Sequence, residues 1–261
     1  MKTGLFPLLL GVMALSLPAA PFTTFQDGET FTYRVGWGIF WRAGKITIAA
    51  REKTVNGARE MHVTTEIRSR GIIRAFYEYE NRGEVVFDQD SGRLLVTREK
   101  GSDGRHDTDT ETTFDYSSHV ARHVDRVHAD RSTTVSIPEG CPLDLISALV
   151  QTRDWNLKPG EKRDVLVNFG EEFFALALYA VDFEEVRTPL GTYRTLMLAP
   201  RMEKDPKGVF KRGGRIRVWI SQGETKLPVK MQLQLNFGSA TMLLADYRLD
   251  PRAPQNLSPI R

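Results

Sequence analysis

The sequence predicts a mainly β protein, in which many short strands form a meandering antiparallel sheet and one principal helix plugs or closes it. Three observations indicate this class. Apolar and polar residues alternate along most of the chain. This two-residue period is typical of a strand with one buried and one solvent-exposed face. Turn-forming residues separate these stretches at short intervals. Residues 142–152 instead have the apolar period of a helix.

The N-terminus has the pattern of a secretory signal. Lys2 is followed by an apolar, uncharged run over residues 5–17, and then by small residues up to Ala20. That run is too short to span a bilayer comfortably, and no later run reaches about 20 apolar residues. We expect residues 1–20 to be a signal peptide cleaved near Ala20, which leaves a periplasmic protein without a transmembrane segment. An uncleaved N-terminal anchor is the alternative.

Alternation predicts about ten to twelve strands joined by short turns. Before the helix, the alternating stretches are residues 31–37, 46–50, 61–67, a strand that begins at Tyr77 and Tyr79, 85–87, 94–96 and the polar stretch 108–137. After the helix they are residues 165–167, 173–181, 193–198, 216–220, 229–237 and 243–247. No linker rich in proline, glycine or serine divides residues 21–250, so we expect one β-rich domain there. Residues 251–261 contain three prolines and no apolar pattern, which is typical of an extended tail.

The predicted helix over residues 142–152 has recognisable ends. Pro142 suits a first helical position, because the N–H that it lacks would have no partner there. Leu143, Ile146 and Val150 fall on one stripe, so we expect this face to be buried against the sheet.

Two charged residues lie near the ends of this helix. Asp144 is in the predicted first turn and Arg153 is near the C-terminal end, where the helix dipole favours a negative and a positive charge respectively. The two side chains could form a binding site. The interpretation that we favour is helix-end electrostatics, together with an anchor onto a neighbouring strand.

Charge and motif content count against several functional classes. The formal net charge is +3, with basic and acidic residues interspersed, which gives no support to nucleic-acid binding. Cys141 is the single cysteine, so the chain has no intramolecular disulfide. The sequence contains no Gly-x-Ser-x-Gly elbow, His-Glu-x-x-His pair or phosphate-binding glycine loop. We therefore expect no cofactor, and a non-enzymatic role is the simplest hypothesis.

Three histidines invite a metal interpretation, because His119, His123 and His128 lie near Asp115 and Asp125. On a strand, however, the four-residue spacing of the first two separates them by about 13 Å. We therefore expect surface histidines and no metal site.

Aromatic residues are candidate ligand contacts. Trp37, Phe40 and Trp41 lie within five residues, and Trp219 shares a strand face with two arginines. Such a tryptophan can line a cavity mouth or be covered by the arginine stems. For most of these aromatics, burial in the core is the alternative.

Three blocks occur in a characteristic order: residues 28–45, which begin Gly-Glu-Thr-Phe-Thr-Tyr; residues 142–160, which begin Pro-Leu-Asp-Leu-Ile-Ser; and residues 213–239, which begin Gly-Gly-Arg-Ile-Arg-Val-Trp. Together they resemble the exported bacterial family catalogued as domain of unknown function 3108. The resemblance implies a fold similar to the half-barrel lipoprotein carriers of the bacterial periplasm. In such a fold a single curved antiparallel sheet, a half-barrel or open barrel, has its concave face covered by the helix above a cavity.

Three functions are compatible with this sequence. We favour an exported, non-catalytic binding protein for a lipid or another amphipathic envelope molecule, because concave β-structures suit apolar ligands. Its candidate ligand-binding residues are Trp37, Phe40, Trp41, Asp144, Arg153 and Trp219. The second hypothesis is a protein- or glycan-interaction module in envelope assembly, with an envelope protein as partner. The third is an envelope-polymer hydrolase that uses acids such as Glu78, Glu80 or Asp144.

Overall fold

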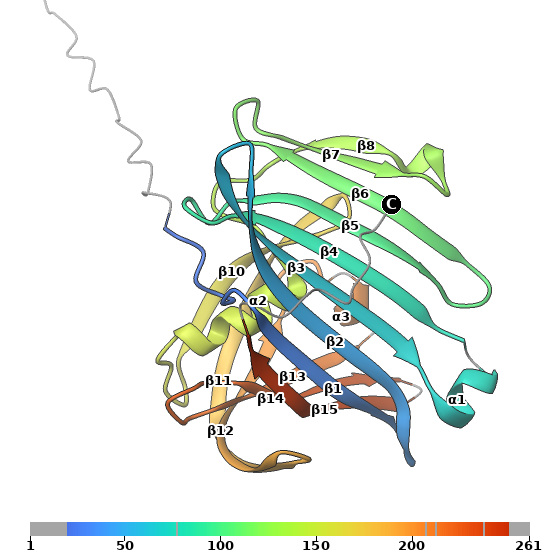
Figure 1. Ribbon diagram of the computed structural model, residues 1–261, viewed down its shortest axis with the longest axis vertical. Helices are drawn as coiled ribbons and strands as arrows, with labels where there is room; N and C mark the ends of the chain where they lie inside the picture. Colours follow the sequence, from blue (N-terminus) through green and yellow to red (C-terminus); the bar gives the residue numbers. More distant parts are fainter. Residues whose placement is uncertain (1–19, 77, 207, 212, 237, 251–261) are drawn as a thin grey trace, which may run out of the picture.

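The computed structural model describes residues 20–250 apart from residues 77, 207, 212 and 237. In this part of the chain fifteen strands form one sheet (Figure 1). Residues 1–19 and 251–261 lie outside the described residues, and with them the predicted signal peptide and the predicted tail.

The elements follow the predicted alternation closely, although the strands exceed the ten to twelve expected. In chain order they are β1 (Glu29–Trp37), β2 (Phe40–Val55), β3 (Ala58–Ser69), β4 (Glu80–Asp88), β5 (Leu94–Ser102), β6 (Asp107–Asp115), β7 (Val120–Asp125), β8 (Thr133–Ser136), β9 (Leu143–Asp144), β10 (Lys162–Phe169), β11 (Glu172–Thr188), β12 (Gly191–Arg201), β13 (Arg215–Ser221), β14 (Pro228–Leu235) and β15 (Gly238–Leu249). The helices are α1 (Gly71–Phe76), α2 (Leu145–Gln151) and α3 (Gly208–Lys211), with 3-10 turns η1 (Ala129–Arg131) and η2 (Thr152–Asp154).

The strand order shows how the two halves of the chain meet. It runs from β8 back to β1, continues through β15, and then runs back to β9. β1 pairs antiparallel with β15, so the first and last strands lie in the middle of the sheet. β8 and β9 are its two edges, and the sheet is not closed into a barrel. The predicted single antiparallel sheet is confirmed, with one exception: β9 pairs with β10 in parallel.

One apolar core fills the concave side of the sheet. Figure 1 shows α2 lying between the half that holds β3 to β8 and the half that holds β10 to β13. Buried side chains of both halves and of the helix belong to the same cluster, among them Phe31, Phe87, Leu149, Leu178 and Leu244. The expected helix over the concave face is confirmed.

The segment before β1 closes one end of this core. Phe22 and Phe25 are buried, and the rings of Phe22 and Phe87 stack with their centroids 4.2 Å apart. The backbone N–H of Phe22 donates to the Gln89 carbonyl, and the Gln89 side chain donates back to the Phe22 carbonyl. The sequence did not predict this closure, because a short irregular segment has no apolar period.

The helix α2 begins later than predicted. Leu143 pairs with Val167 as part of β9, and Asp144 is the N-cap residue. The Asp144 carboxylate accepts hydrogen bonds from the backbone N–H groups of Ile146, at 2.9 Å, and Ser147, at 3.3 Å. A residue whose side chain caps a helix precedes the first turn, so Pro142 does not occupy the first helical position.

A buried ion pair fixes the C-terminal end of α2 to β1. Both terminal guanidinium nitrogens of Arg153, in η2, donate to the Glu29 carboxylate at 2.6 and 2.8 Å. The Tyr247 hydroxyl and the backbone N–H of Gln26 also donate to this carboxylate. Burial, and then the Glu29 carboxylate, raise the pKa of Tyr247 to about 12, so its hydroxyl keeps the proton that it donates. The expected anchor of Arg153 onto a neighbouring strand is confirmed.

Loss of this ion pair should destabilise the protein strongly. Arg153→Met should lower the free energy of unfolding by about 3–5 kcal/mol, because the Glu29 carboxylate stays buried without its cation. Urea unfolding at neutral pH measures the change. Asp90→Asn is the matched control, because it breaks the exposed Arg59–Asp90 pair, and it should change the unfolding midpoint little. Equal effects of the two variants would contradict the role given to Arg153.

The helix stripe gives a second prediction. Leu143 and Val150 are buried as expected, whereas Ile146 is only partly buried. Leu149 is one of the buried residues of α2. Leu149→Ala should lower the free energy of unfolding by about 2–5 kcal/mol. Ile146→Ala should cost clearly less in the same urea titration, because part of its surface already lacks protein contacts. A larger loss for Ile146→Ala would show that α2 packs through another face.

Candidate ligand-binding site

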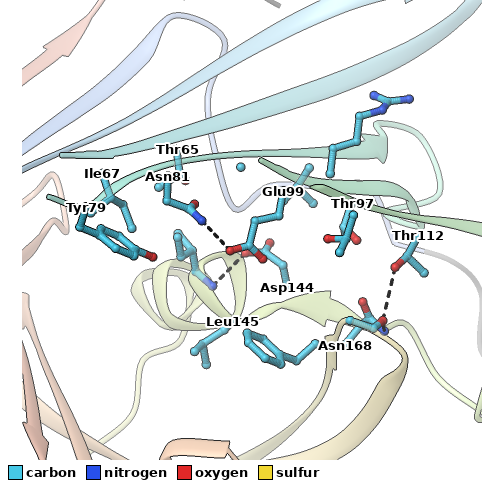
Figure 2. A pocket seen from close by; sticks show the side chains of 17 residues that line it. Thr65, Ile67, Tyr79, Asn81, Thr97, Glu99, Thr112, Asp144, Leu145 and Asn168 are labelled. Carbon is cyan, nitrogen blue, oxygen red and sulfur yellow. Dashed lines mark hydrogen bonds between the residues drawn. The ribbon is translucent and has the colours of Figure 1, made fainter. Parts of the chain in front are cut away.

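A cavity of about 260 Å³ lies between the start of α2 and the concave face of β3, β4, β5 and β6 (Figure 2). The short connection from β10 to β11 completes it. The cavity therefore lies where the N-terminal half of the sheet, the helix and the C-terminal half meet.

The apolar part of the lining comes from all three of these regions. It consists of Ile67, Val85, Leu145, Ile146 and Phe169. Phe169 is 62% exposed although it lines the cavity, so its ring lies at the rim. An apolar molecule could therefore contact this wall and still reach solvent past Phe169.

The polar part of the lining holds two carboxylates, Glu99 and Asp144, and two amides, Asn81 and Asn168, beside threonine and tyrosine hydroxyls. Asn81 donates to the Glu99 carboxylate at 2.6 Å. Asn168 is buried and its side-chain nitrogen donates to the carbonyls of Gly170 and Glu172. Its side-chain oxygen is buried without a hydrogen-bond partner in the described part of the chain. A buried acceptor left unpaired is costly, so this atom favours a bound donor.

The acid at the helix start adds to this acceptor character. Burial raises the pKa of Asp144, while hydrogen bonds from Ser147 and Ile146 oppose that rise. Arg98 also contributes to the lining, but its guanidinium donates to Glu84 and Glu111. The cavity can accept hydrogen bonds from a hydroxyl or an amine, whereas a phosphate or carboxylate would meet like charge.

Side-chain contacts join the β10–β11 connection to β6 and β7 across the cavity. The Thr112 hydroxyl donates to the Gly170 carbonyl at 3.4 Å, and the rings of Phe114 and Phe173 meet edge to face. His123 is buried here, with Nδ1 2.9 Å from the Thr112 oxygen. The expectation of a surface position is thus wrong for His123, since strand alternation alone does not show what covers a sheet face.

The structure places the predicted site residues in four different regions. Asp144 lines the cavity, while Arg153 lies at the other end of α2 in its ion pair with Glu29. Trp219 is buried on β13: its indole N–H donates to Glu184, and the Lys230 ammonium lies 4.0 Å from its ring centroid. Asp144 and Arg153 therefore do not form a common site.

The aromatic candidates lie at the β1–β2 hairpin. Trp37 and Phe40 pair across its turn, and Trp41 follows on β2. A separate hollow of about 320 Å³ contains Phe40 and Trp41, and it shares no lining residue with the cavity under α2. The structure does not bring these aromatics to the helix.

The acids considered for hydrolysis also have structural partners. Glu78 and Glu80 both pair with Arg74 in exposed positions. The Asp144 carboxylate caps α2. None of these three contacts points to acid–base chemistry.

Sequence reasoning missed most of the polar lining, namely Asn81, Thr97, Glu99 and Asn168. One signal was present. Asn81 and Gly83 have the same parity as Val85 and Phe87, so polar or small residues interrupt the inward apolar face of β4. Nothing in the sequence indicates that Asn168 would lie opposite this face.

In the ranges that the structure describes, no three His, Cys, Asp or Glu residues gather as a metal site would require. Among the same residues, the helices are all too short or too polar to cross a membrane.

Comparisons with known proteins agree with this architecture. Residues 32–245 match the family described as Protein of unknown function (DUF3108), which confirms the resemblance. A β-barrel-like protein of domain of unknown function DUF1849 from Brucella abortus has a TM-score of 0.50 and 7% identity, covering 85% of this chain and 97% of that chain. That likeness concerns the fold alone.

Two further solved structures are less similar. A candidate lipoprotein from Parabacteroides distasonis has a TM-score of 0.31 and 10% identity, covering 88% of this chain and 99% of that chain. A candidate exported protein with a YmcC-like fold from Bacteroides fragilis has a TM-score of 0.33 and 12% identity, with the same coverage of 88% and 99%. No curated protein sequence matches this chain.

The two roles of Asp144, capping the helix and lining the cavity, can be separated by substitution. Asp144→Ala should lower the free energy of unfolding by about 0.5–2 kcal/mol through loss of the cap. Asp144→Asn keeps an acceptor and removes a buried charge, so it should be at least as stable as the wild type at neutral pH.

The raised pKa of Asp144 means that its ionised carboxylate lowers the stability of the wild-type protein. This loss of stability appears as the pH rises through the folded-state pKa of Asp144. The advantage of Asn over Asp should therefore shrink on acidification. Urea unfolding at neutral and acid pH measures both effects. An Asn variant as unstable as the Ala variant at neutral pH would show that the charge itself is required.

Proposed function

The chain belongs to the DUF3108 family of proteins of unknown function, and from this premise we propose that it is an exported, non-catalytic binding protein for an amphipathic molecule. The observation that carries the proposal is the cavity under α2, with its apolar wall and its unpaired buried acceptor. Concave sites with a mostly apolar lining and a few placed polar groups are typical of small-molecule binding.

The two parts of the lining suggest how such a ligand lies. Val85, Leu145 and Ile146 would contact its apolar part. Glu99 and Asn168 would accept hydrogen bonds from its polar end. Because the lining acids repel anions, we propose a hydroxyl or amine at that end rather than a free phosphate.

The size of the cavity limits what enters it. Its volume of about 260 Å³ lies just below the range of about 300–1,000 Å³ that is typical of ligand pockets. One end of a lipid-like molecule fits this space, and the remainder would leave past the exposed ring of Phe169. A whole phospholipid is too large for the cavity in this conformation.

The N-terminal sequence supports the location that we propose. Residues 5–17 have the length and apolarity of a secretory signal, and small residues follow them. Export to the periplasm would place the cavity near envelope lipids and their precursors.

Filling the cavity tests this function. Gly83 lines it, and a Cβ added there would meet its nearest neighbour, the Arg98 carbonyl oxygen, at 3.7 Å, which is ordinary contact. Gly83→Val should therefore fold normally, since a β-branched residue suits a strand, while its methyl groups occupy the ligand volume. We expect the variant to lose co-purifying ligand, measured by native mass spectrometry and solvent extraction of protein from the periplasmic fraction.

Gly223→Val is the matched control. Its Cβ would have no neighbour within 4 Å, and the residue lies outside the cavity, so this variant should keep its ligand. Retention of ligand by Gly83→Val would place the binding site elsewhere. Wild-type protein that carries no ligand at all would favour an interaction module instead.

A further inference from the structure

The tip of the β1–β2 hairpin presents three large apolar side chains to solvent. Ile39 is 82% exposed, Trp41 is 80% exposed and Phe40 is 42% exposed. We call these three residues the aromatic tip. A two-residue turn in which Gly38 has φ +54° holds them together at the end of two long strands. Contiguous exposed apolar side chains mark interaction surfaces.

The helix α1 lies beside this tip (Figure 1). The hollow of about 320 Å³ around the aromatic tip is completed by Gly71 and Ile73 of α1 and by Arg42 of β2. The backbone N–H of Arg70 donates to the Ala43 carbonyl, so the segment that leads into α1 is attached to β2. The apolar surface therefore extends from the hairpin onto α1.

A row of three basic residues crosses the sheet next to the aromatic tip. Arg34 on β1 lies opposite Lys45 on β2, which lies opposite Arg68 on β3. By strand alternation all three project from the same face as Trp41, away from the core. In the part of the chain that the structure describes, none of the three side chains makes a hydrogen bond or an ion pair. We call them the basic row.

The basic row conflicts with the pattern on the rest of this face. There, cross-strand neighbours carry opposite charges and form ion pairs, such as Glu66 with Arg82 and Glu84 with Arg98. Glu80 faces Arg68 from β4, but its carboxylate bonds to Arg74. Like charges directly opposite each other destabilise a sheet. Arg68 still interacts electrostatically with Glu80, whereas Arg34 lies opposite Leu243 and Lys45, and Lys45 lies between Arg34 and Arg68. Neither Arg34 nor Lys45 has an acid directly opposite it, so an external anionic surface would stabilise both.

We propose that the aromatic tip and the basic row dock this protein on an anionic lipid bilayer. Aromatic side chains prefer the membrane–water interface, and each basic residue near an anionic leaflet adds attraction. Lys45 is four residues from Trp41 along β2, a distance of at most about 13 Å, because the register shift opposite Gly36 makes this stretch irregular. A tip buried about 5–10 Å into the interface therefore places the basic row at the level of the phosphates.

The docked orientation would bring the cavity close to the membrane. Ile67 of the cavity wall neighbours Arg68 in sequence and pairs with Ile46, next to Lys45. Phe22 stacks on Phe87, which lies at the other end of β4 from Glu80, the residue opposite Arg68. This inference does not rest on the proposed function, since it needs no ligand in the cavity.

Vesicle binding by the full isolated protein tests the proposal. We expect co-sedimentation with vesicles of equal parts phosphatidylglycerol and phosphatidylcholine, weakening as salt is added, and little binding to phosphatidylcholine alone. Trp41→Ser should weaken binding about tenfold, and Lys45→Ser about fivefold. Trp41 is exposed whereas Trp155 and Trp219 are buried, so tryptophan emission should shift to the blue on binding.

Two control variants change residues of the same kinds elsewhere. Leu190, exposed in the β11–β12 turn, and Arg215, exposed on β13, should both tolerate change to serine without loss of binding. Equal binding to neutral and anionic vesicles, or equal losses from the controls, would overturn the proposal. So would a self-associated wild type that becomes monomeric in Trp41→Ser without any vesicle binding, because the tip would then be a contact between copies.

Discussion

The ion pair between Arg153 and Glu29 is the constraint on which the arrangement of helix and sheet depends. Glu29 belongs to β1, the strand that joins the two halves of the sheet through β15, so α2 is attached at the middle of the sheet. Asp144 fixes the other end of the helix through its cap and the pairing of β9 with β10. Two acidic residues thus hold seven helical residues across the concave face, and the cavity exists because the helix is held there.

The interior has a different character at its two ends. Near Phe22 and Phe87 the space is filled by stacked aromatic rings, which leaves nothing for a ligand. Toward Asn81 and Glu99 the inward residues are polar or small, and packing stops short of filling the volume. Polar residues on the inward face of a sheet weaken the core, and such local conflicts between sequence and fold are expected at functional sites. This contrast argues for a site at the polar end.

The outer surface shows a similar conflict at the β1–β2 hairpin. Ion pairs between neighbouring strands stabilise most of the outer face of β3, β4 and β5, whereas Arg34, Lys45 and Arg68 stand opposite one another. Exposed Ile39 and Trp41 lie beside them. The first feature places like charges opposite one another and the second leaves apolar surface in water. The docking on an anionic bilayer that we propose would account for both.

The sequence by itself determined the mainly β class, most strand positions and the existence of α2, and it placed the charge of Arg153 near the end of that helix while leaving open whether Arg153 anchors the helix or binds a ligand. These follow from local period and from charge at a helix end, which neighbouring residues suffice to define. The tertiary structure decided which strands meet, the identity of Glu29 as partner, and the cavity residues Asn168 and Glu99. The strand pairing, the Glu29 partner and the cavity residues depend on contacts between residues far apart in the chain. Alternation predicts which side chains share a face of a strand, but it does not predict what packs against that face. The same reason explains why Trp37, Phe40 and Trp41, grouped in sequence as cavity residues, lie at a hairpin outside it.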